Sequence, residues 1–314
     1  MWLEKNRKLA DFTTFKLGGQ ADFLVKLKKS DELKKFLEWL DQTERKNLPI
    51  LILGGGSNLL INDQGYRGLI VKPEFNLIEL IGEKIVKVES GAMMTELIEF
   101  VANQGLAGLE WAGGLPGTVG GAVRGNAGCF GGEIKDQLIE VEALNFKTKK
   151  VEIFENQACQ FSYRQSFFKQ NPDWLILSAK FIFNQNKSPL ELKKIISEKI
   201  FYRQNHHPLD YPNAGSIFKN IPLVQAGSKL KDLAEKKGVI KNDPFPLIPT
   251  AFVINELGLK GCRFGGAMVS DKHTNFIVNF NQARTTDVVA LINLIKTKVK
   301  NEFDFDLEEE IKII

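Results

Sequence analysis

The sequence contains few of the residues that build metal sites or disulfide frameworks. Its 314 residues include only three histidines and three cysteines, and Cys129, Cys159 and Cys262 lie far apart. These residues show neither the paired spacing of a zinc site nor the density of a disulfide scaffold. We therefore expect no metal ion, and we interpret the cysteines as small buried apolar residues in a reducing compartment.

The sequence also lacks a long apolar run and a strong charge of either sign. No segment approaches the ~20 apolar residues of a membrane span, and the amino terminus has no signal-peptide core. The formal net charge is only +4, which is too weak to indicate a nucleic-acid binder but is compatible with an anionic small molecule. These features predict a soluble, cytoplasmic protein with no nucleic-acid or membrane partner, and they imply no protein partner.

Strands and helices alternate along the chain, with hairpin-like pairs among them, which predicts α+β lobes rather than one parallel sheet. Apolar residues at helical spacing predict a helix that begins near Ser30, with Ser30 as its N-cap. Further helices are predicted at residues 93–104, 189–203, 229–237, 251–257 and 286–303. Strands are predicted at residues 21–28, 48–53, 84–89, parts of 138–154, 174–183, 275–280 and 308–314. The irregular, proline-containing stretch 206–215 is predicted as a domain boundary.

Two glycine-rich segments are candidates for ligand binding. Gly54, Gly55 and Gly56 follow an apolar run, and residues 113–132 hold nine of the 27 glycines. Glycine lets backbone N–H groups approach an anion closely, although the spacing of the first segment matches neither the P-loop nor the dinucleotide-binding fingerprint. Each segment also has an alternative interpretation without a ligand. The first can be a sharp turn, and the second can be a set of tight bends. Two such loops together favour a cofactor that contains a diphosphate.

Three other segments carry polar side chains in informative settings. Arg164 lies among aromatic residues, where it can orient a carboxylate or simply stack on Phe161 or Tyr163. Ser216 is either an ordinary loop hydroxyl or a proton donor, with Lys219 nearby as an anion contact. Residues 308–310 are three consecutive glutamates, one of which can point inward if the carboxyl terminus forms a packed strand.

Taken in order, these segments resemble the bacterial UDP-N-acetylenolpyruvoylglucosamine reductases (UDP-N-acetylmuramate dehydrogenases) over nearly the whole chain. The matching motifs are TTFKLGGQAD, LGGGSNLLINDQGYRGLIV, GLEWAGGLPGTVGGAVRGNAGCFGGEIKD, SYRQSFFK, AGSIFKN, LGLKGCRFGGAMVSDKHTNFIVN and LEEEIK. The resemblance implies a two-lobed FAD-binding domain of the vanillyl-alcohol-oxidase or PCMH-like type, followed by a smaller α/β substrate domain. The implied bounds are residues 1–72 and 73–204 for the FAD-binding lobes and 205–314 for the substrate domain, whose last strand returns to the active site.

The resemblance also implies the reaction and its residues. NADPH would supply a hydride through non-covalently bound FAD to UDP-N-acetylglucosamine enolpyruvate, yielding UDP-N-acetylmuramate for peptidoglycan. Arg164, Ser216 and Glu310 match the catalytic residues, and Tyr163, Lys219, Asn220 and His273 match substrate contacts. The residues that match the FAD-binding positions are Gly54, Gly55, Gly56, Ser57, Asn58, Leu59, Pro116, Gly117, Thr118, Gly120, Gly121, Asn126 and Gly128.

Some positions depart from the pattern of this family. Gln20 and Glu309 stand where proline is usual, and Ser162 and Gln165 flank Tyr163-Arg164 where glycine and aspartate are common. Glu310 is therefore assigned by register alone. The short interval between Arg164 and Ser216 resembles the subtype without a substrate-loop insertion. Another FAD oxidoreductase of the same fold and a non-catalytic nucleotide-sugar binder are the alternative functions.

Overall fold

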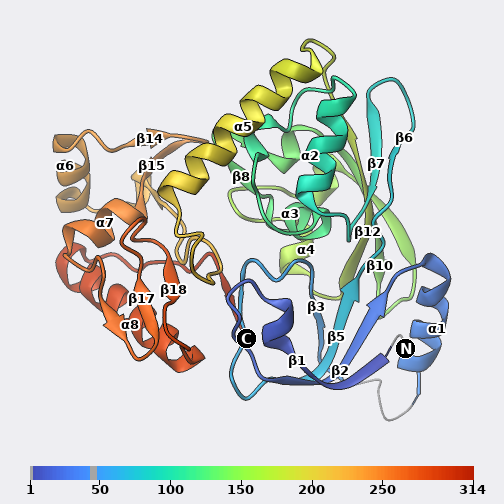
Figure 1. The fold of residues 1–314 in the computed structure, drawn as a ribbon, viewed down its shortest axis with the longest axis horizontal. Coiled ribbons are helices and arrows are strands. Elements are labelled where there is room, and N and C mark those ends of the chain that lie inside the picture. The colour runs from blue at the N-terminus through green and yellow to red at the C-terminus, as the bar shows by residue number, and fades with distance from the viewer. Residues whose placement is uncertain (1–2, 43–47) are drawn as a thin grey trace. The chain divides into compact units, whose positions relative to one another are not determined.

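The computed structural model describes residues 3–42 and 48–314, and the chain divides into two compact units (Figure 1). Unit 1 consists of residues 1–7, 21–55 and 67–202, and unit 2 of residues 8–20, 56–66 and 203–314. The bounds of the three expected lobes stay a prediction, and the two units group residues 8–20, 56–66 and 203–204 with the carboxyl-terminal part of the chain. The first two segments join the carboxyl-terminal unit because Phe15, Leu17 and Leu60 are buried in its core.

The amino-terminal part of unit 1 is a four-stranded sheet with strand order β1-β2-β5-β3. Its elements are β1 (Leu3–Lys8), β2 (Gln20–Leu27), α1 (Ser30–Leu40), β3 (Ile50–Ile52) and β5 (Tyr66–Pro73). Helix α1 buries Phe36 and Trp39 in the same core as Val25 and Leu69. The prediction of Ser30 as the N-cap of this helix is wrong. The cap is Lys29, whose N–H donates to the Glu32 carboxylate at 3.2 Å, and the Ser30 side chain lies outside the described atoms.

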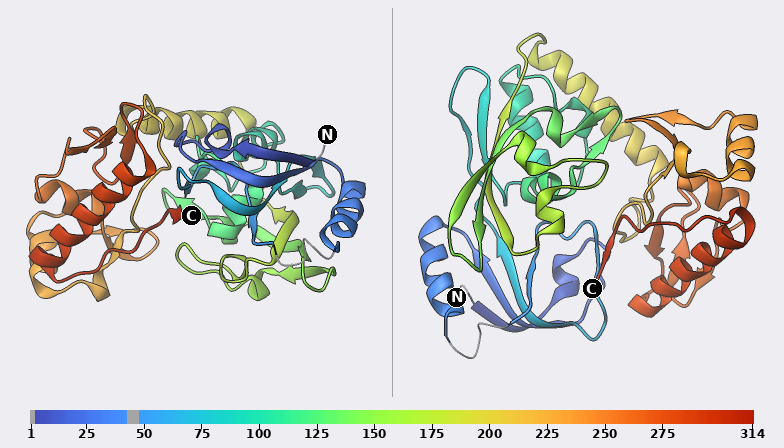
Figure 2. Two further views of the ribbon diagram at one scale, coloured as in Figure 1. Left: turned by 90° about the horizontal axis from the view of Figure 1, so that it is seen from below. Right: turned by 180° about the vertical axis from the view of Figure 1, so that it is seen from behind.

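The second part of unit 1 is an antiparallel sheet with strand order β11-β10-β12-β7-β6. Its strands are β6 (Ile78–Leu80), β7 (Ile85–Glu89), β10 (Leu138–Asn145), β11 (Val151–Glu155) and β12 (Trp174–Ile182). Along β7, Val86 and Val88 are fully buried and Lys87 is not, which is the period of two expected for a strand covered on one face. The covering helices are α2 (Met94–Asn103) and α3 (Val119–Gly125), which lie in front of the sheet in Figure 1 and behind it in the right-hand view of Figure 2.

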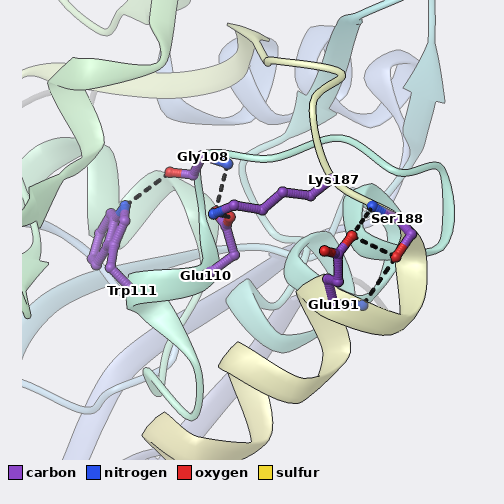
Figure 3. A network of polar contacts seen from close by, with 6 residues as sticks. All are labelled: Gly108, Glu110, Trp111, Lys187, Ser188 and Glu191. Atoms are coloured by element: carbon purple, nitrogen blue, oxygen red, sulfur yellow. Dashed lines mark hydrogen bonds and ion pairs between the residues drawn. The ribbon is translucent and has the colours of Figure 1, made fainter.

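Short elements and one long helix complete unit 1. They are η2 (Glu110–Ala112), β8 (Gly128–Cys129), β9 (Gly132–Glu133), η3 (Ile134–Asp136), η4 (Asn156–Cys159), α4 (Phe167–Gln170) and α5 (Pro189–His206), which continues into unit 2. A polar network connects the start of α5 to η2 (Figure 3). The Glu110 carboxylate accepts from the Gly108 N–H at 2.6 Å and from Lys187 Nζ at 3.0 Å. The Trp111 indole donates to the Gly108 carbonyl at 3.0 Å, which fixes the segment that enters the glycine-rich stretch.

Unit 2 packs three helices against small sheets. Its elements are η1 (Leu9–Phe12), β4 (Leu59–Leu60), β13 (Ile221–Pro222), η5 (Leu223–Gln225), α6 (Ser228–Lys236), β14 (Lys241–Asn242), β15 (Pro246–Ile248), α7 (Thr250–Glu256), β16 (Arg263–Phe264), β17 (Ala267–Val269), β18 (Ile277–Asn279), α8 (Thr285–Phe303) and β19 (Lys312–Ile313). Strand β19 runs parallel to β4, so the carboxyl terminus lies beside the segment that follows Gly56. No described helix combines the length and the hydropathy that crossing a membrane requires.

The burial of the cysteines follows the prediction only in part. All three are free thiols, and Cys159 is buried, which raises the pKa of its thiol to about 12. Cys129 and Cys262 are only partly buried. They are therefore not the fully buried apolar residues that the sequence suggested.

Candidate cofactor and substrate site

Within unit 1, the two glycine-rich segments of the sequence meet. A Cβ atom on Gly55 would lie 2.6 Å from Gly117 Cα, and one on Gly54 would lie 2.6 Å from Thr118 Oγ1. Real Cβ atoms essentially never come this close to a backbone atom, so the contact between the loops requires glycine at residue 55. The tertiary structure thus joins two segments that the sequence could only identify separately.

The backbone N–H groups at this junction fall into two sets. Val119 and Gly120 donate to the carbonyls of Ala92 and Ser90, each at 2.9 Å, and these bonds anchor the start of α3 to the end of β7. In the part of the chain that the structure describes, the N–H groups of Gly55, Gly117 and Thr118 donate to no acceptor. Unpaired amides on closely approaching glycine loops suit an anion such as a diphosphate.

In unit 2, the carboxyl-terminal strand contacts the rest of the first loop. Asn58 Nδ2 donates to the carbonyl of Glu310 at 3.0 Å, and the Lys312 N–H donates to the Asn58 carbonyl at 3.0 Å. Residues Leu59 and Leu60 then pair with Lys312 and Ile313. Asn58 and Glu310, two residues that the sequence singled out 252 positions apart, are therefore in direct contact.

Ser216 lies next to a residue that is hydrogen-bonded to the segment leading into β19. The Glu310 N–H donates to the carbonyl of Ile217, the residue after Ser216, at 2.8 Å. On the other side, the Ile217 N–H donates to the Asn275 carbonyl at 2.8 Å. Ser216 is partly exposed, and its hydroxyl makes no hydrogen bond to another described residue. The structure therefore brings Ser216 and Glu310 onto adjacent, hydrogen-bonded segments.

The three consecutive glutamates differ in their partners. The Glu308 carboxylate is paired with Lys219 Nζ, and the Glu309 carboxylate with Lys296 Nζ at 2.8 Å. The backbone N–H and carbonyl of Glu310 make the two hydrogen bonds described above. The predicted substrate contact Lys219 is thus engaged with the residue two positions before Glu310, and its side chain is only 10% exposed.

Arg164 is fixed in unit 1 beside two predicted cofactor residues. Its Nη2 donates to the Gly128 carbonyl at 2.7 Å, and Asn126 Nδ2 donates to the Ser162 carbonyl at 3.0 Å. The guanidinium also lies 5.1 Å from the centre of the Tyr163 ring, so the stacking suggested by the sequence is present. The φ angle of Arg164 is 57°, in the left-handed region that non-glycine residues seldom occupy. Such strain is typical of side chains whose direction matters for function.

Two other predicted substrate residues lie in unit 2. The Asn220 side-chain carbonyl accepts from the Thr250 N–H at 3.2 Å. His273 packs against Phe276 and His207, with ring centroids 4.8 and 5.5 Å away. Its Nδ1 is buried without a hydrogen-bond partner among the described residues. Burial, followed by the charge of Lys241, lowers the pKa of His273 to about 4, so this ring is neutral at pH 7.

The partly buried pair of His207 and His273 predicts a loss of stability in acid. Burial, together with the charge of the neighbouring His273, also lowers the pKa of His207 to about 4 from its ordinary 6.5. Between pH 4 and pH 6.5 the unfolded chain binds protons that the folded chain does not. The free energy of unfolding is therefore highest above pH 6.5 and decreases as the pH falls towards 4. Urea titrations at about pH 7 and pH 5 should show this fall. The fall should shrink in the His207→Gln, His273→Gln double variant and persist in exposed His206→Gln. If the free energy of unfolding fell as much in the double variant as in the wild type, the acid sensitivity would not come from His207 and His273.

One residue of this site was missed from the sequence. Ser90 is 1% exposed at the end of β7, its carbonyl accepts from Gly120, and its hydroxyl has no partner among the described residues. The available signal was a small polar residue followed by glycine directly after a predicted strand. That signal is common to many turns, and only the tertiary contact with α3 gives it meaning.

Comparisons with known proteins identify related sequences and domains. The family model described as an FAD-binding domain matches residues 21–152, and the model for the carboxyl-terminal domain of UDP-N-acetylenolpyruvoylglucosamine reductase matches residues 207–314. A protein of that name from Carboxydothermus hydrogenoformans is 37% identical over 99% of this chain and 93% of its own. The same enzyme from Caldanaerobacter subterraneus is 37% identical over 98% and 92%.

A solved structure supports the same fold. The crystal structure of UDP-N-acetylenolpyruvylglucosamine reductase from Thermus caldophilus has a TM-score of 0.75 and 29% identity, and covers 99% of this chain and 98% of its own. The predicted α+β fold, with an FAD-binding domain followed by a reductase carboxyl-terminal domain, is confirmed.

Proposed function

This chain belongs to the UDP-N-acetylenolpyruvoylglucosamine reductase family, and from that membership we propose its substrate, its hydride donor and the roles of its site residues. The protein is an FAD-dependent oxidoreductase of peptidoglycan precursor synthesis. Its substrates are UDP-N-acetylglucosamine enolpyruvate and NADPH, and its product is UDP-N-acetylmuramate. The observation that carries the proposal is the direct contact of the two glycine loops, with unpaired amides on both.

The loop junction fits the diphosphate of FAD. The Gly54–Thr118 and Gly55–Gly117 approaches leave no room for side chains, and the open N–H groups of Gly55, Gly117 and Thr118 are donors for phosphate oxygens. When bound, FAD supplies the hydride that it has taken from NADPH. The protein itself supplies binding, orientation and a proton.

The catalytic roles follow from the charge that the reaction creates. Adding a hydride to the terminal carbon of the enolpyruvyl alkene leaves negative charge on the neighbouring carbon and its carboxylate. Arg164 holds that carboxylate through its planar guanidinium, which the Gly128 carbonyl and the Tyr163 ring orient. Ser216 donates its hydroxyl proton to the carbon that bears the negative charge, and Glu310 supports this proton transfer. Tyr163, Lys219, Asn220 and His273 are proposed substrate contacts.

The glutamate assignment predicts different effects for three equivalent substitutions. Glu310→Gln should lower turnover by ~10²-fold or more, because a group that supports proton transfer is typically worth that much. Glu308→Gln and Glu309→Gln remove carboxylates already paired with Lys219 and Lys296, and should change turnover by less than about tenfold, as expected when an ion pair is weakened and the lost carboxylate has no part in the proton transfer. Steady-state kinetics on the three variants checks the register. If Glu308→Gln were nearly inactive and Glu310→Gln remained active, the assignment of the supporting glutamate to position 310 would be wrong.

The loop contact predicts a specific loss of FAD binding. Gly55→Ala introduces a methyl group 2.6 Å from Gly117 Cα. We expect the FAD affinity to fall by roughly tenfold or more, since overpacking of this kind typically costs 1–3 kcal/mol. Gly125→Ala is the matched control, because a Cβ there meets nothing within 4 Å. If both variants bound FAD with equal affinity, the contact between the two loops would have no role in FAD binding.

The proposal as a whole is tested by the visible spectrum of the purified chain. We expect a flavin absorption band, and denaturation should release free FAD because the cofactor is bound without a covalent link. A colourless protein that cannot be reconstituted with FAD would refute the proposal.

A further inference from the structure

We propose that Lys72 and Arg124 form a pair of cations that neutralises the diphosphate of FAD at the junction of the two glycine loops. This inference rests on the function proposed above and names residues that the sequence did not single out. The open amides already described are neutral donors, whereas a diphosphate carries two negative charges. Two charged side chains of unit 1 stand at the two loops that would hold it.

Lys72 is attached to the first loop. It lies on β5, and its Nζ donates to the carbonyl of Gly54 at 3.2 Å. Within the described residues it forms no ion pair, although the charge of Glu74 acts on it. Burial lowers the pKa of its ammonium group. A partly buried ammonium group with no carboxylate partner is costly, and an anion at the Gly54–Gly55 loop would relieve that cost.

Arg124 belongs to the second loop. It lies in α3, three and four residues after Gly121 and Gly120. Because helical side chains lean towards the amino-terminal turn, we infer that the Arg124 side chain covers the turn of Gly120 and Gly121, which have no side chains of their own to exclude it. The guanidinium is partly buried, which lowers its pKa, and it has no hydrogen-bond or ion-pair partner among the described residues. It is thus a second cation without an assigned anion.

The contact between the loops brings together the segments that carry these two cations. Gly54, to which Lys72 is bonded, approaches Thr118, the N-cap of the helix that carries Arg124. Every other described arginine in unit 1 has a charged, polar or aromatic partner: Arg7, Arg67 and Arg164 pair with Glu4, Asp22 and the Gly128 carbonyl. An anion bound at the junction therefore has a cation available on each loop.

The test measures binding by the full chain after FAD has been removed. Lys72→Met and Arg124→Met should each weaken FAD affinity by about 10- to 100-fold, the usual worth of one charge-assisted hydrogen bond. ADP, which carries the diphosphate without the flavin, should lose affinity by a similar factor. Riboflavin, which carries no phosphate, should bind all variants equally. Lys72→Arg and Arg124→Lys should retain most of the FAD affinity.

Arg67→Met is the matched control, because Arg67 lies on the same strand as Lys72 and its side chain is 81% exposed. The proposal is overturned if the Met variants bind FAD and ADP as tightly as this control, or if they lose riboflavin in equal measure. Thermal unfolding of the apoproteins shows whether a Met variant is misfolded. If it is, the FAD affinities of Lys72→Arg and Arg124→Lys test the proposal: retained affinity supports it, and lost affinity contradicts it. A wild-type chain that binds neither FAD nor ADP would instead refute the proposed function.

Discussion

Arg164→Lys should reduce turnover by roughly 10²- to 10³-fold, the range found when one donor to a developing negative charge is removed. Lysine keeps the positive charge but loses the planar, two-point grip on a carboxylate. It also loses the geometry that lets one side chain contact the Gly128 carbonyl and lie over the Tyr163 ring. The left-handed backbone at residue 164 costs lysine and arginine the same, so the comparison isolates the head group. The measurement is steady-state kinetics together with the FAD content of the purified variant.

FAD content is the internal control of this experiment, because the proposed diphosphate contacts do not involve Arg164. Arg67→Lys, on an exposed side chain of the same unit, should leave turnover unchanged. If Arg164→Lys were nearly as active as the wild type, the arginine would serve the structure of the loop around Gly128 rather than the reaction. A variant that lost FAD and turnover together would point to the same conclusion.

Ser216→Ala should affect only one half of the catalytic cycle. The serine hydroxyl is proposed to give its proton after the hydride has reached the substrate, and NADPH does not need that proton. Loss of flavin absorbance on mixing with NADPH should therefore proceed at close to the normal rate. Recovery of absorbance on mixing with the enolpyruvyl substrate should slow by something like 10²- to 10⁴-fold, the usual worth of a positioned general acid. Stopped-flow absorbance measures both steps.

The hydrogen bonds around Ser216 make this substitution a clean test. The segment is held by the Ile217 backbone, which bonds to Glu310 and Asn275, and alanine preserves both bonds. Ser228→Ala, at an exposed position of the same unit, should leave both steps unchanged. A Ser216→Ala variant that slowed reduction by NADPH and left the second step untouched would exclude the assigned role.

The sequence predicted the regular elements well where apolar periodicity is strong. Helix α8 buries Val288, Leu291, Ile292, Ile295 and Val299 at helical spacing, and it occupies nearly the residues predicted. Strand β1, with the sequence LEKNRK, has no such pattern and was not predicted, because it forms by pairing with β2. The carboxyl-terminal strand is shorter than predicted. It consists of Lys312–Ile313 alone, because only the two residues of β4 pair with it.

The site was predictable as a set of motifs and not as an arrangement. Consecutive glycines indicate close backbone approach, but the partner of that approach, Gly117 for Gly55, is a tertiary fact. The three glutamates are identical in sequence, and only the structure shows that Glu308 pairs with Lys219 and Glu309 with Lys296. Lys72 and Arg124 carry no motif of their own. Both are partly buried and pair with no carboxylate among the described residues, a property that no sequence pattern reveals.

We propose that this chain passes hydride equivalents from NADPH to an enolpyruvyl nucleotide sugar. The most direct measurement is a two-step anaerobic experiment on the purified protein, with the flavin absorbance recorded throughout. One equivalent of NADPH should bleach the flavin, and adding UDP-N-acetylglucosamine enolpyruvate without oxygen should restore the absorbance and yield one equivalent of UDP-N-acetylmuramate. Flavin that stays bleached until oxygen is admitted, with no UDP-N-acetylmuramate formed, would contradict the account.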